Sequence, residues 1–571
     1  MNSKNITIEE FDSFECLESE KWNELLARSP SATVFQSWEW LNAWWETFGC
    51  GKLWIVCARN AKALSGAAAL YIDESSTLRF VGQGHADYGQ MLYAQDEENT
   101  LNALVEHIFE RSDKWKHAEL SCVLAGCALA DRLLSKGAWV SSKMASPRVL
   151  FEEKSAASLL GKSSLKRHAK KLASLGPVTV EHLDSSEQIQ PVLDAFFLQH
   201  QERWALTRSP SLFLDQQNQR FYRKLAEQAV TDGRFVLTRV LLNGKDAAMH
   251  FGFRSQQQLI WYKPTYDPRL SHAGPGEVLI AELIKKCVVD GLRGLDFTRG
   301  DESFKLRFAS EIREVLTFEV ASKFWLKQLE LNRHRLKDAA VAIIDKAHLH
   351  RAIATVVHNA RATMRVIRSK GIRAACIAAK ERMEQHGPRH VDVFIRTAND
   401  CAVEDERISV HTLETLNEIL ATFDVTDPEH LEVLSDTPVY LEAGARLWVA
   451  KCSGSIVSCG WELRGTGVDV TEIRARLHFP STVVCLMEFR TFSKHQRKGY
   501  YAALLKSISA SEGTDHQLIY ALSHNIASVR AIRKAGFEHA GRVTRSVLGA
   551  LRFKLLSANA ALSATPLQQK K

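Results

Sequence analysis

Apolar positions recur along this chain with two different periods, and the periods predict where helices and strands lie. Apolar residues between 34 and 48 are spaced like one face of a helix, whereas 53–58 and 64–71 have the pattern of strands. The segment 165–172 is typical of a basic helix, and 196–204 continues a helical pattern. The first part of the chain is therefore expected to mix helices with strands.

A hairpin signal marks the middle of the chain. The runs 235–242 and 246–254 are apolar, and Asn243-Gly244 lies between them. Two-residue hairpin turns favour this dipeptide because both of their central residues need positive φ. The pattern then predicts three more elements: a strand at 259–263, a helix at 276–290 and a short strand at 294–297.

The last part of the chain predicts a similar succession of strands, a glycine-containing loop and helices. Its strands are expected at 446–450, 455–462 and 482–489, the loop at 494–499, a helix at 500–510, a strand at 517–521, a helix at 526–535 and a last strand from about 541.

Both periods occur throughout, so we expect an α/β (α+β) fold with mixed sheets. The length of 571 residues predicts three or four domains at roughly 100–200 residues each. The predicted segments are an N-terminal unit at 1–150, a second unit at 151–322, a connector at 323–388, a C-terminal domain at 389–558 and a flexible tail at 559–571.

The positive charge is concentrated in the connector. The net charge is +8, and 325–390 alone carries 14 Lys/Arg against 5 Asp/Glu. Apolar residues from 340 to 367 have helical spacing with a basic opposite face. A solvated helical linker explains this pattern. Contact with an anionic membrane or a polyanionic substrate stays open, whereas nucleic acid is disfavoured because aromatic residues are scarce there.

The composition excludes several classes of protein. Residues 1–20 are acidic and lack the apolar centre of a secretory signal. No stretch approaches the ~18 apolar residues of a membrane span. The 11 cysteines form no CxxC pair and no zinc-type cluster with histidine. We therefore expect a cytoplasmic protein without a metal, at most peripheral to the inner face of a membrane.

The strongest chemical signal is the segment 483–505. An apolar strand leads into the basic loop 494–499, and a helix begins directly after Gly499. A helix N-terminus presents unpaired N–H groups and the positive end of its dipole, which suit a pyrophosphate. Gly499 lets the backbone approach such a group closely, while Gln496, Arg497 and Lys498 add donors and charge.

This segment resembles the GNAT acetyltransferase superfamily, whose acetyl-CoA loop reads Gln/Arg-x-x-Gly-x-Gly/Ala. Gln496 and Gly499 match, and Tyr501 stands at the last position. Downstream, Asn525-Ile-Ala-Ser-Val-Arg-Ala-Ile-Arg-Lys-Ala-Gly-Phe537 resembles the superfamily's Asn-x-x-Ser/Ala…Lys-x-Gly-Phe signature. The resemblance implies acetyl-CoA as acyl donor, without a metal, bound by Gln496, Arg497, Lys498, Gly499, Tyr501 and Asn525.

Glu488, on the strand before the loop, is the candidate general base. An amine must lose a proton before it attacks a thioester, and members of the superfamily often carry a glutamate at this place. The alternative is a solvent-facing or salt-bridged strand residue. Many members carry a tyrosine as general acid in the helix of the second signature. Ile532 holds that position here, so another group or water must supply the proton.

A second resemblance covers 22–321. It is carried by the segments 34–48, 243–253, 262–268, 275–276 and 295–305. These resemble the CelD-type acetyltransferase-like family, which is related to the Fem peptidoglycan aminoacyltransferases. Its members pair two GNAT-like folds, so the resemblance implies three such units: a fused pair, the basic helical connector and a separate C-terminal GNAT domain. Many members act in polysaccharide or envelope biosynthesis.

Charges crowd together after the predicted strand 294–297. Charged residues at the C-terminal end of a strand commonly line a cleft in α/β folds. The alternative is a structural cluster of ion pairs. His250 lies in an alternating strand and is expected to be packed. The candidate substrate-binding residues are Asp296, Arg299, Asp301 and Lys305.

These observations favour an acyl-CoA-dependent N-acyltransferase that transfers acetyl to a primary amine, either a small molecule or a glycan precursor. Two alternatives stay open. One is aminoacyl transfer from charged tRNA, as in the Fem relatives, although no heptad run interrupts 159–320. The other is a non-catalytic, membrane-peripheral scaffold of polysaccharide assembly.

Overall fold

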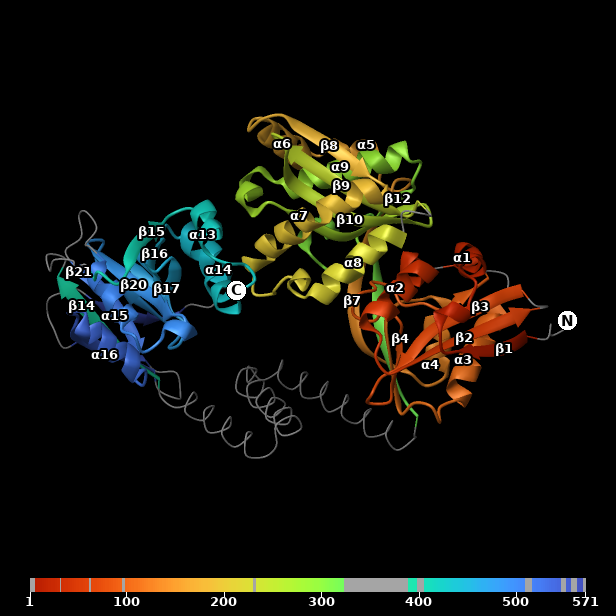
Figure 1. The fold of residues 1–571 in the computed structure, drawn as a ribbon, viewed down its shortest axis with the longest axis horizontal. Coiled ribbons are helices and arrows are strands. Elements are labelled where there is room, and N and C mark those ends of the chain that lie inside the picture. The colour runs from red at the N-terminus through yellow and green to blue at the C-terminus, as the bar shows by residue number, and fades with distance from the viewer. Residues whose placement is uncertain are drawn as a thin grey trace. The chain divides into compact units, whose positions relative to one another are not determined.

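The computed structural model describes residues 6–30, 32–60, 63–94, 98–228, 233–322, 389–397, 405–508, 516–545, 551–555 and 562–567. The predicted basic connector at 323–388 lies outside the described residues, as does about half of the predicted tail. The chain forms two compact units (Figure 1). The first comprises 1–205 and 209–339, and the second comprises 340–571 together with 206–208.

Within its described residues, the first unit has one mixed sheet of thirteen strands, in the order β1-β2-β3-β4-β6-β13-β7-β12-β11-β10-β9-β8, with β5 beside β3. The elements of its first half are β1 (Ile6–Phe11), η1 (Phe14–Cys16), α1 (Ser19–Arg28), η2 (Val34–Gln36), α2 (Trp38–Phe48), β2 (Lys52–Asn60), β3 (Ala63–Ile72), β4 (Thr77–Phe80), β5 (Leu92–Tyr93), α3 (Glu98–Glu110), β6 (His117–Leu124), α4 (Ala128–Ser135) and β7 (Trp139–Leu150).

The second half of this unit supplies the other strands of the sheet. Its elements are α5 (Ala156–Leu160), α6 (Ser163–Ala173), β8 (Val178–Leu183), α7 (Ser186–Ala205), η3 (Leu212–Leu214), α8 (Gln216–Gln228), β9 (Phe235–Leu242), β10 (Lys245–Ser255), β11 (Gln258–Tyr266), η4 (Pro268–Ala273), α9 (Pro275–Val289), β12 (Gly294–Asp296), α10 (Ser303–Phe308) and β13 (Glu311–Ala321).

Strand β13 joins the two halves of the sheet. It is the last strand in sequence, yet it lies between β6 and β7 of the first half and pairs with both in antiparallel fashion. β7 pairs in turn with β12 of the second half. The expected mixed α/β class is therefore confirmed. The boundary at 150/151 and the division into three units stay predictions, because the two halves share one hydrogen-bonded sheet.

Helices cover both faces of this sheet, and alternation along the strands explains why. On β2, Ile55 and Cys57 belong to the aromatic-rich core beneath α1, α2, α7 and α8. Their neighbours Trp54 and Val56 belong to the core beneath α3 and α4. Successive strand residues point to opposite faces, so a strand that is apolar at every position is buried on both sides.

Two local predictions from the sequence had different outcomes in the structure. The pattern from 34 to 48 predicted one helix, but the chain breaks at Ser37, whose Oγ accepts a hydrogen bond from the Trp40 N–H at 3.3 Å and so caps α2. The Asn243-Gly244 turn joins β9 to β10 as predicted. Both residues have positive φ, 52° and 75°, as a type I′ turn requires.

The second unit contains an eight-stranded sheet, again counted within the described residues, in the order β15-β16-β17-β20-β21-β14-β22-β23. Its elements, with those of the small sheet β18-β19-β24, are β14 (Arg389–Thr397), β15 (Ser409–Leu413), α13 (Leu416–Thr422), α14 (Pro428–Glu442), β16 (Arg446–Cys452), β17 (Ser455–Arg464), β18 (Gly467–Val470), β19 (Ala475–His478), β20 (Val483–Thr491), η5 (Ser493–His495), α15 (Tyr500–Ser507), β21 (His516–Leu522), α16 (Ile526–Lys534), β22 (Glu538–Arg545), β23 (Leu551–Leu555) and β24 (Ser563–Pro566).

The pairing of β20 with β21 is parallel, whereas the other pairings of this sheet are antiparallel. Helix α15 connects the two parallel strands and packs its apolar face on the core with α16. In the part of the chain that the structure describes, no helix is both long and apolar enough to cross a bilayer.

Candidate active site

The parallel strands β20 and β21 separate at their C-terminal ends. They pair only where Val483–Leu486 faces His516–Ile519. The residues that follow, 487–489 on β20 and 520–522 on β21, line a cavity of about 170 Å³. A cleft beyond the carboxyl ends of parallel strands is a common ligand position in α/β sheets, so this cavity is the first candidate for a site.

A β-bulge lies at this separation. Two residues of β20, Glu488 and Phe489, lie opposite the single residue Gly460 of β17, and neither has a strand partner in the register. A bulge leaves backbone groups outside the ladder and redirects side chains. A Cβ atom at Gly460 would collide with the ring of Phe489. The bulge therefore requires glycine on the facing strand.

Glu488, the predicted base, lies on this bulge with a φ of 51°, a region that residues other than glycine rarely adopt. Its side chain is exposed at the cavity mouth, but the surrounding protein removes much of its solvation. This desolvation, with the nearby carboxylates of Glu472 and Asp436, raises the pKa of Glu488. Arg490 opposes the shift, but its guanidinium is paired with Glu432. Glu488 is therefore a stronger base than an ordinary glutamate.

Two phenols line the same cavity. The Tyr501 hydroxyl lies 3.2 Å from Oγ of Ser528, and burial raises the pKa of Tyr501 to about 12. Burial and nearby acidic groups, Glu488 among them, raise the pKa of Tyr520 as well. Both phenols stay protonated at neutral pH. Ile532, which holds the position expected for an acid, is fully buried in the core of this unit.

The basic loop ends at Gly499, which is the N-cap of α15. Gly499 has a φ of 82°, and a Cβ there would meet no atom of the described chain within 4 Å. The cap contributes no side-chain hydrogen bond, so the N-terminus of α15 lacks the side-chain acceptor that an N-cap residue usually supplies. Arg497 and Lys498 are exposed. Gln496 folds back, and its Nε2 donates to the Thr491 carbonyl at 3.3 Å.

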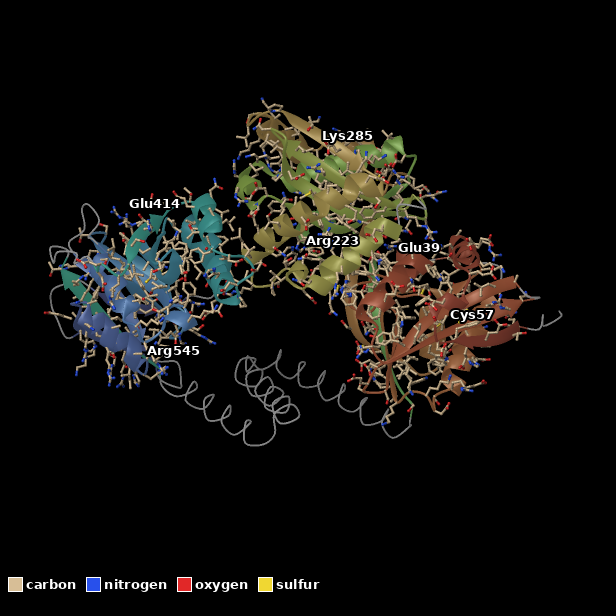
Figure 2. The ribbon with its side chains drawn as sticks, in the orientation of Figure 1. Glu39, Cys57, Arg223, Lys285, Glu414 and Arg545 are labelled. Atoms are coloured by element: carbon tan, nitrogen blue, oxygen red, sulfur yellow. The ribbon has the colours of Figure 1, made fainter. Side chains whose placement is uncertain are left out.

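Asn525 lines the cavity and also begins α16. Its Oδ1 accepts a hydrogen bond from the Ser528 N–H at 3.1 Å, which leaves its amide N–H groups available. The structure thus places Glu488, Tyr501 and Asn525 around one cavity. The other predicted cofactor-binding residues, 496–499, lie in the loop that leads to Tyr501. The side chains of this unit, among them Glu414 and Arg545, are drawn in Figure 2.

The charged residues that follow β12 in the first unit do not share one site. Asp296 is buried and pairs with Arg313 at 2.7 Å. Lys305 is also buried, and its Nζ donates to the Arg299 carbonyl at 2.7 Å. Asp301 is exposed. Most of this group therefore belongs to a structural network.

Arg299 is the member of the group with access to a large cavity. It lines a space of about 480 Å³ at the separation of β4 and β6, and Asp87 holds its guanidinium at 2.8 Å. Asp296 lines a different cavity, of about 310 Å³. The two predicted substrate-binding residues thus face separate spaces.

The second half of the first unit repeats the arrangement of bulge and separating strands. β11 pairs with β12 only over Gln258–Ile260, in parallel, and Trp261 and Tyr262 then lie opposite the single Gly252 of β10. A Cβ at Gly252 would collide with the ring of His250. His250 is fully buried and stacks on Trp261 at 5.0 Å between ring centroids.

Aromatic side chains line this second separation. Phe297 and Phe304 lie against Trp261, with centroids at 6.2 Å and 6.1 Å. The bulge presents Trp261 and Tyr262 where β20 presents Glu488 and Phe489. This half therefore offers rings rather than a base at the corresponding place.

No pattern in the sequence indicated Glu472, Asp436 or Tyr520. Glu472 follows β18, 16 residues before Glu488, and Asp436 lies on α14, 52 residues before it. Both stand outside any motif. They affect the base only because the fold brings their negative charges close enough to raise the pKa of Glu488. Among the described residues, no group of three His, Cys, Asp or Glu side chains has the arrangement of a metal site.

Comparisons with known proteins connect this fold to a family. Residues 161–306 match the model of the acetyltransferase (GNAT) domain. FemX is similar over 56% of this chain and 99% of its own, with 12% identity and a TM-score of 0.42. A tandem GNAT protein of the clavulanic acid biosynthesis pathway is similar over 56% and 99%, with 14% identity and a TM-score of 0.35.

L-PGS from Bacillus licheniformis is similar over 56% of this chain and 96% of its own, with 10% identity and a TM-score of 0.37. With TM-scores below 0.5, these likenesses do not bear on the reaction. No curated protein matches the chain. The matched residues contain β11, α9 and β12, the segment in which β11 bulges opposite Gly252. Residues 161–306, about a quarter of the chain, are therefore similar to the acetyltransferase (GNAT) domain.

Proposed function

We propose that the second compact unit is an acyl-CoA-dependent N-acyltransferase that transfers acetyl to a primary amine. The observation that carries this proposal is Glu488. A carboxylate with a raised pKa lies on a bulge, at the mouth of a cavity between two separating parallel strands, and the helix that joins these strands begins at a glycine without a side-chain cap.

The acyl donor is expected to bind along the loop and the cavity. The amides after Gly499 and the positive end of the α15 dipole suit its pyrophosphate, and Arg497 and Lys498 add charge. The pantetheine arm would pass Asn525 toward the separation of β20 and β21. The backbone N–H groups at the bulge would polarise the thioester carbonyl as negative charge develops on its oxygen.

The reaction requires three proton transfers, because the nitrogen loses two protons and the sulfur gains one. Glu488 removes the first proton from the ammonium, directly or through a water, and the free amine attacks the thioester carbonyl. When the tetrahedral intermediate collapses, its nitrogen gives up the second proton to water, the C–S bond breaks, and the leaving sulfur takes a proton. Tyr501 and Tyr520 are the protonated groups in the cavity, so one of them is expected to supply it.

The proposal also covers the amine acceptor and the place in the cell where the protein works. The acceptor is an amine on a small molecule or a glycan precursor, used in polysaccharide or envelope biosynthesis. The protein would work in the cytoplasm, and the basic segment 323–388 would provide any contact with an anionic membrane surface. The excess of positive charge in that segment supports this part.

Acetyl transfer by the full chain tests the proposal. Acetyl-CoA would be incubated with a panel of amines, and CoA release and acetylated product measured by chromatography. We expect release that depends on an amine and is lost in Glu488→Gln, while acetyl-CoA affinity is kept. A folded chain that neither binds acetyl-CoA nor releases CoA would contradict it and favour the tRNA-dependent or scaffold alternatives.

A further inference from the structure

A small three-stranded sheet contributes one wall residue to the cavity beside Glu488. β18 and β19 form a hairpin, and β24 pairs with the other edge of β19. β24 comes from the part of the predicted tail that the structure describes, so the segment 563–566 completes this sheet. Unpaired strand edges are usually covered in native proteins, and β24 covers the second edge of β19.

The turn between β18 and β19 carries Glu472 to the cavity. Glu472 lines the same space as Glu488, and its neighbour Ile473 is fully buried. The Arg474 N–H closes the turn by donating to the Thr471 carbonyl at 3.2 Å. Arg474 has a φ of 46°, which residues other than glycine rarely adopt. A backbone conformation of this kind persists where surrounding contacts hold it.

Two contacts from outside the hairpin hold this turn. Nη1 of Arg545, on β22, donates to the carbonyls of Ile473 and Arg474 at 2.9 Å each. Arg545 is labelled in Figure 2. The Leu567 N–H, directly after β24, donates to the Arg474 carbonyl at 3.1 Å. A guanidinium presents its donors in a fixed plane, so Arg545 fixes the direction of two successive carbonyls.

The register places the end of β24 at the turn. Pro566, the last residue of β24, lies opposite Ala475, the first residue of β19. Farther along the pair, Oγ1 of Thr565 lies 2.8 Å from Nε2 of His478. Loss of β24 would therefore remove both the pairing of β19 and the Leu567 contact at the turn.

The position of Glu472 matters because its negative charge acts on Glu488. Burial, Glu472 and Asp436 raise the pKa of Glu488. Arg490 opposes this shift and is paired with Glu432 of α14. The other titratable groups that face Glu488 are three phenols with raised pKa values: Tyr440 of α14, Tyr520 of β21 and Tyr501 of α15. The phenols are neutral at neutral pH, so the turn supplies one of the two charges that strengthen the base.

We propose that Arg545 and the C-terminal strand β24 are positioning groups of the acyl-transfer site, which hold the turn 471–474 so that the Glu472 carboxylate stays in the cavity beside Glu488. Neither is among the described residues that line the cavity, so both act through Glu472. The inference rests on the proposed function, because it assigns these groups to the reaction of Glu488.

Titration of Glu488 by carbon NMR tests the proposal in the full chain. Glutamate is isotope-labelled, and the Glu488 resonance is identified by its absence in Glu488→Gln. Glu472→Gln should lower the pKa of Glu488, because it removes a like charge. Arg545→Met should lower this pKa in the same direction and by no more, because Glu472 leaves the cavity. When Glu472→Gln is already present, Arg545→Met should add no further shift.

The sign of the shift separates positioning from a direct effect of charge. Loss of the Arg545 cation alone would raise the pKa of Glu488, since a nearby cation favours a carboxylate. A rise, no change, or a further shift in the double variant would overturn the role of Arg545. Arg545→Lys keeps the charge and a donor and should restore most of the wild-type pKa. Arg552→Met, at an exposed arginine of the neighbouring β23, is the matched control and should leave it unchanged.

A pair of deletions tests the strand. Deletion of 562–571 removes β24 and should lower the pKa of Glu488, whereas deletion of 568–571 keeps the strand and should not. If the longer deletion does not fold, Leu567→Pro replaces it, because proline removes the N–H that donates to the Arg474 carbonyl. An unchanged pKa of Glu488 in the folded deletion, or in Leu567→Pro, would overturn the role of β24.

Kinetics distinguish failure of this inference from failure of the proposed function. The acidic limb of kcat/KM for acetyl transfer should move to lower pH in Arg545→Met, as in Glu472→Gln. An active wild-type chain whose profile is unchanged in Arg545→Met would contradict the inference alone. A folded wild-type chain without acetyl transfer would contradict the proposed function, whereas the titration of Glu488 would still decide whether Arg545 and β24 position Glu472.

Discussion

Among the described residues, two strand–helix–strand modules contain a bulge: β11-α9-β12 and β20-α15-β21. They share a backbone plan and differ in the side chains on the bulge. In both, a strand bulges opposite a glycine, a helix follows, and the next strand pairs in parallel before it separates. The module in 161–306 presents Trp261, and aromatic rings line its separation. The module of the second unit presents Glu488 beside an open polar cavity.

This difference shows that the same backbone fold can carry different side chains at its site. The family match covers the module whose separation is lined by aromatic rings, whereas a carboxylate on the bulge faces the cavity in the other module. The backbone plan can be kept while the side chains at two positions of one strand decide whether a carboxylate or an aromatic ring lines the space.

The largest expected effect comes from removing the base. Glu488→Gln keeps the size of the side chain but cannot accept the ammonium proton, so kcat should fall by about 10²–10⁴-fold, with acetyl-CoA affinity nearly unchanged. Steady-state kinetics of acetyl transfer measures this. Glu442→Gln, at an exposed glutamate at the end of α14, is the matched control and should keep full activity. Equal losses in both variants would contradict the role of Glu488.

The second-largest expected effect is a loss of affinity for the acyl donor. Gly499→Glu places a carboxylate where the pyrophosphate is expected, at a left-handed φ of 82°, and should lower acetyl-CoA affinity about tenfold to hundredfold. Gly444→Glu places the same residue at another left-handed glycine with open space around it. Calorimetry should show unchanged affinity for that control. A similar loss of affinity in both would attribute the effect to stability.

A paired substitution compares the two bulges directly. Gly460→Ala and Gly252→Ala each force a methyl group against a ring, and overpacking of this kind costs about 1–3 kcal/mol. Denaturant unfolding should show a comparable loss of stability in both. Acetyl transfer should fall in Gly460→Ala and persist in folded Gly252→Ala. Loss of transfer in Gly252→Ala alone would move the reaction to 161–306.

The smallest effect is a shift in pH dependence. Burial and the carboxylates of Glu472 and Asp436 raise the pKa of Glu488. The active form is the deprotonated one, so kcat/KM should rise with pH through this elevated pKa. Glu472→Gln removes one like charge and lowers the pKa, so the acidic limb of the profile should move to lower pH. A shift to higher pH would contradict the assignment of the base.

Periodicity located most elements because it is a local property. The hairpin at Asn243-Gly244, the helix α9 and the strand β20 lie within a few residues of where the pattern placed them. The sequence did not show that β13 enters the sheet between β6 and β7, since that pairing joins residues nearly two hundred positions apart. The break at Ser37 depended on one side-chain cap.

The candidate site was predictable only in part. Glu488 and Asn525 lie in motifs, and the structure places both on one cavity. The bulge was not visible, because it is a one-residue change of register that leaves the hydrophobic pattern intact. Glu472 and Asp436 reach the base only through the fold, so no spacing in the sequence could indicate them.

Hydrogen–deuterium exchange of the full chain, with and without acetyl-CoA, tests the central claim most directly. The account predicts slower exchange on adding acetyl-CoA in peptides that cover 487–489, 496–502 and 520–528, with no change across 261–277. Protection confined to 261–277, or no protection anywhere in a folded chain, would contradict the assignment of the acyl-donor site to the second unit.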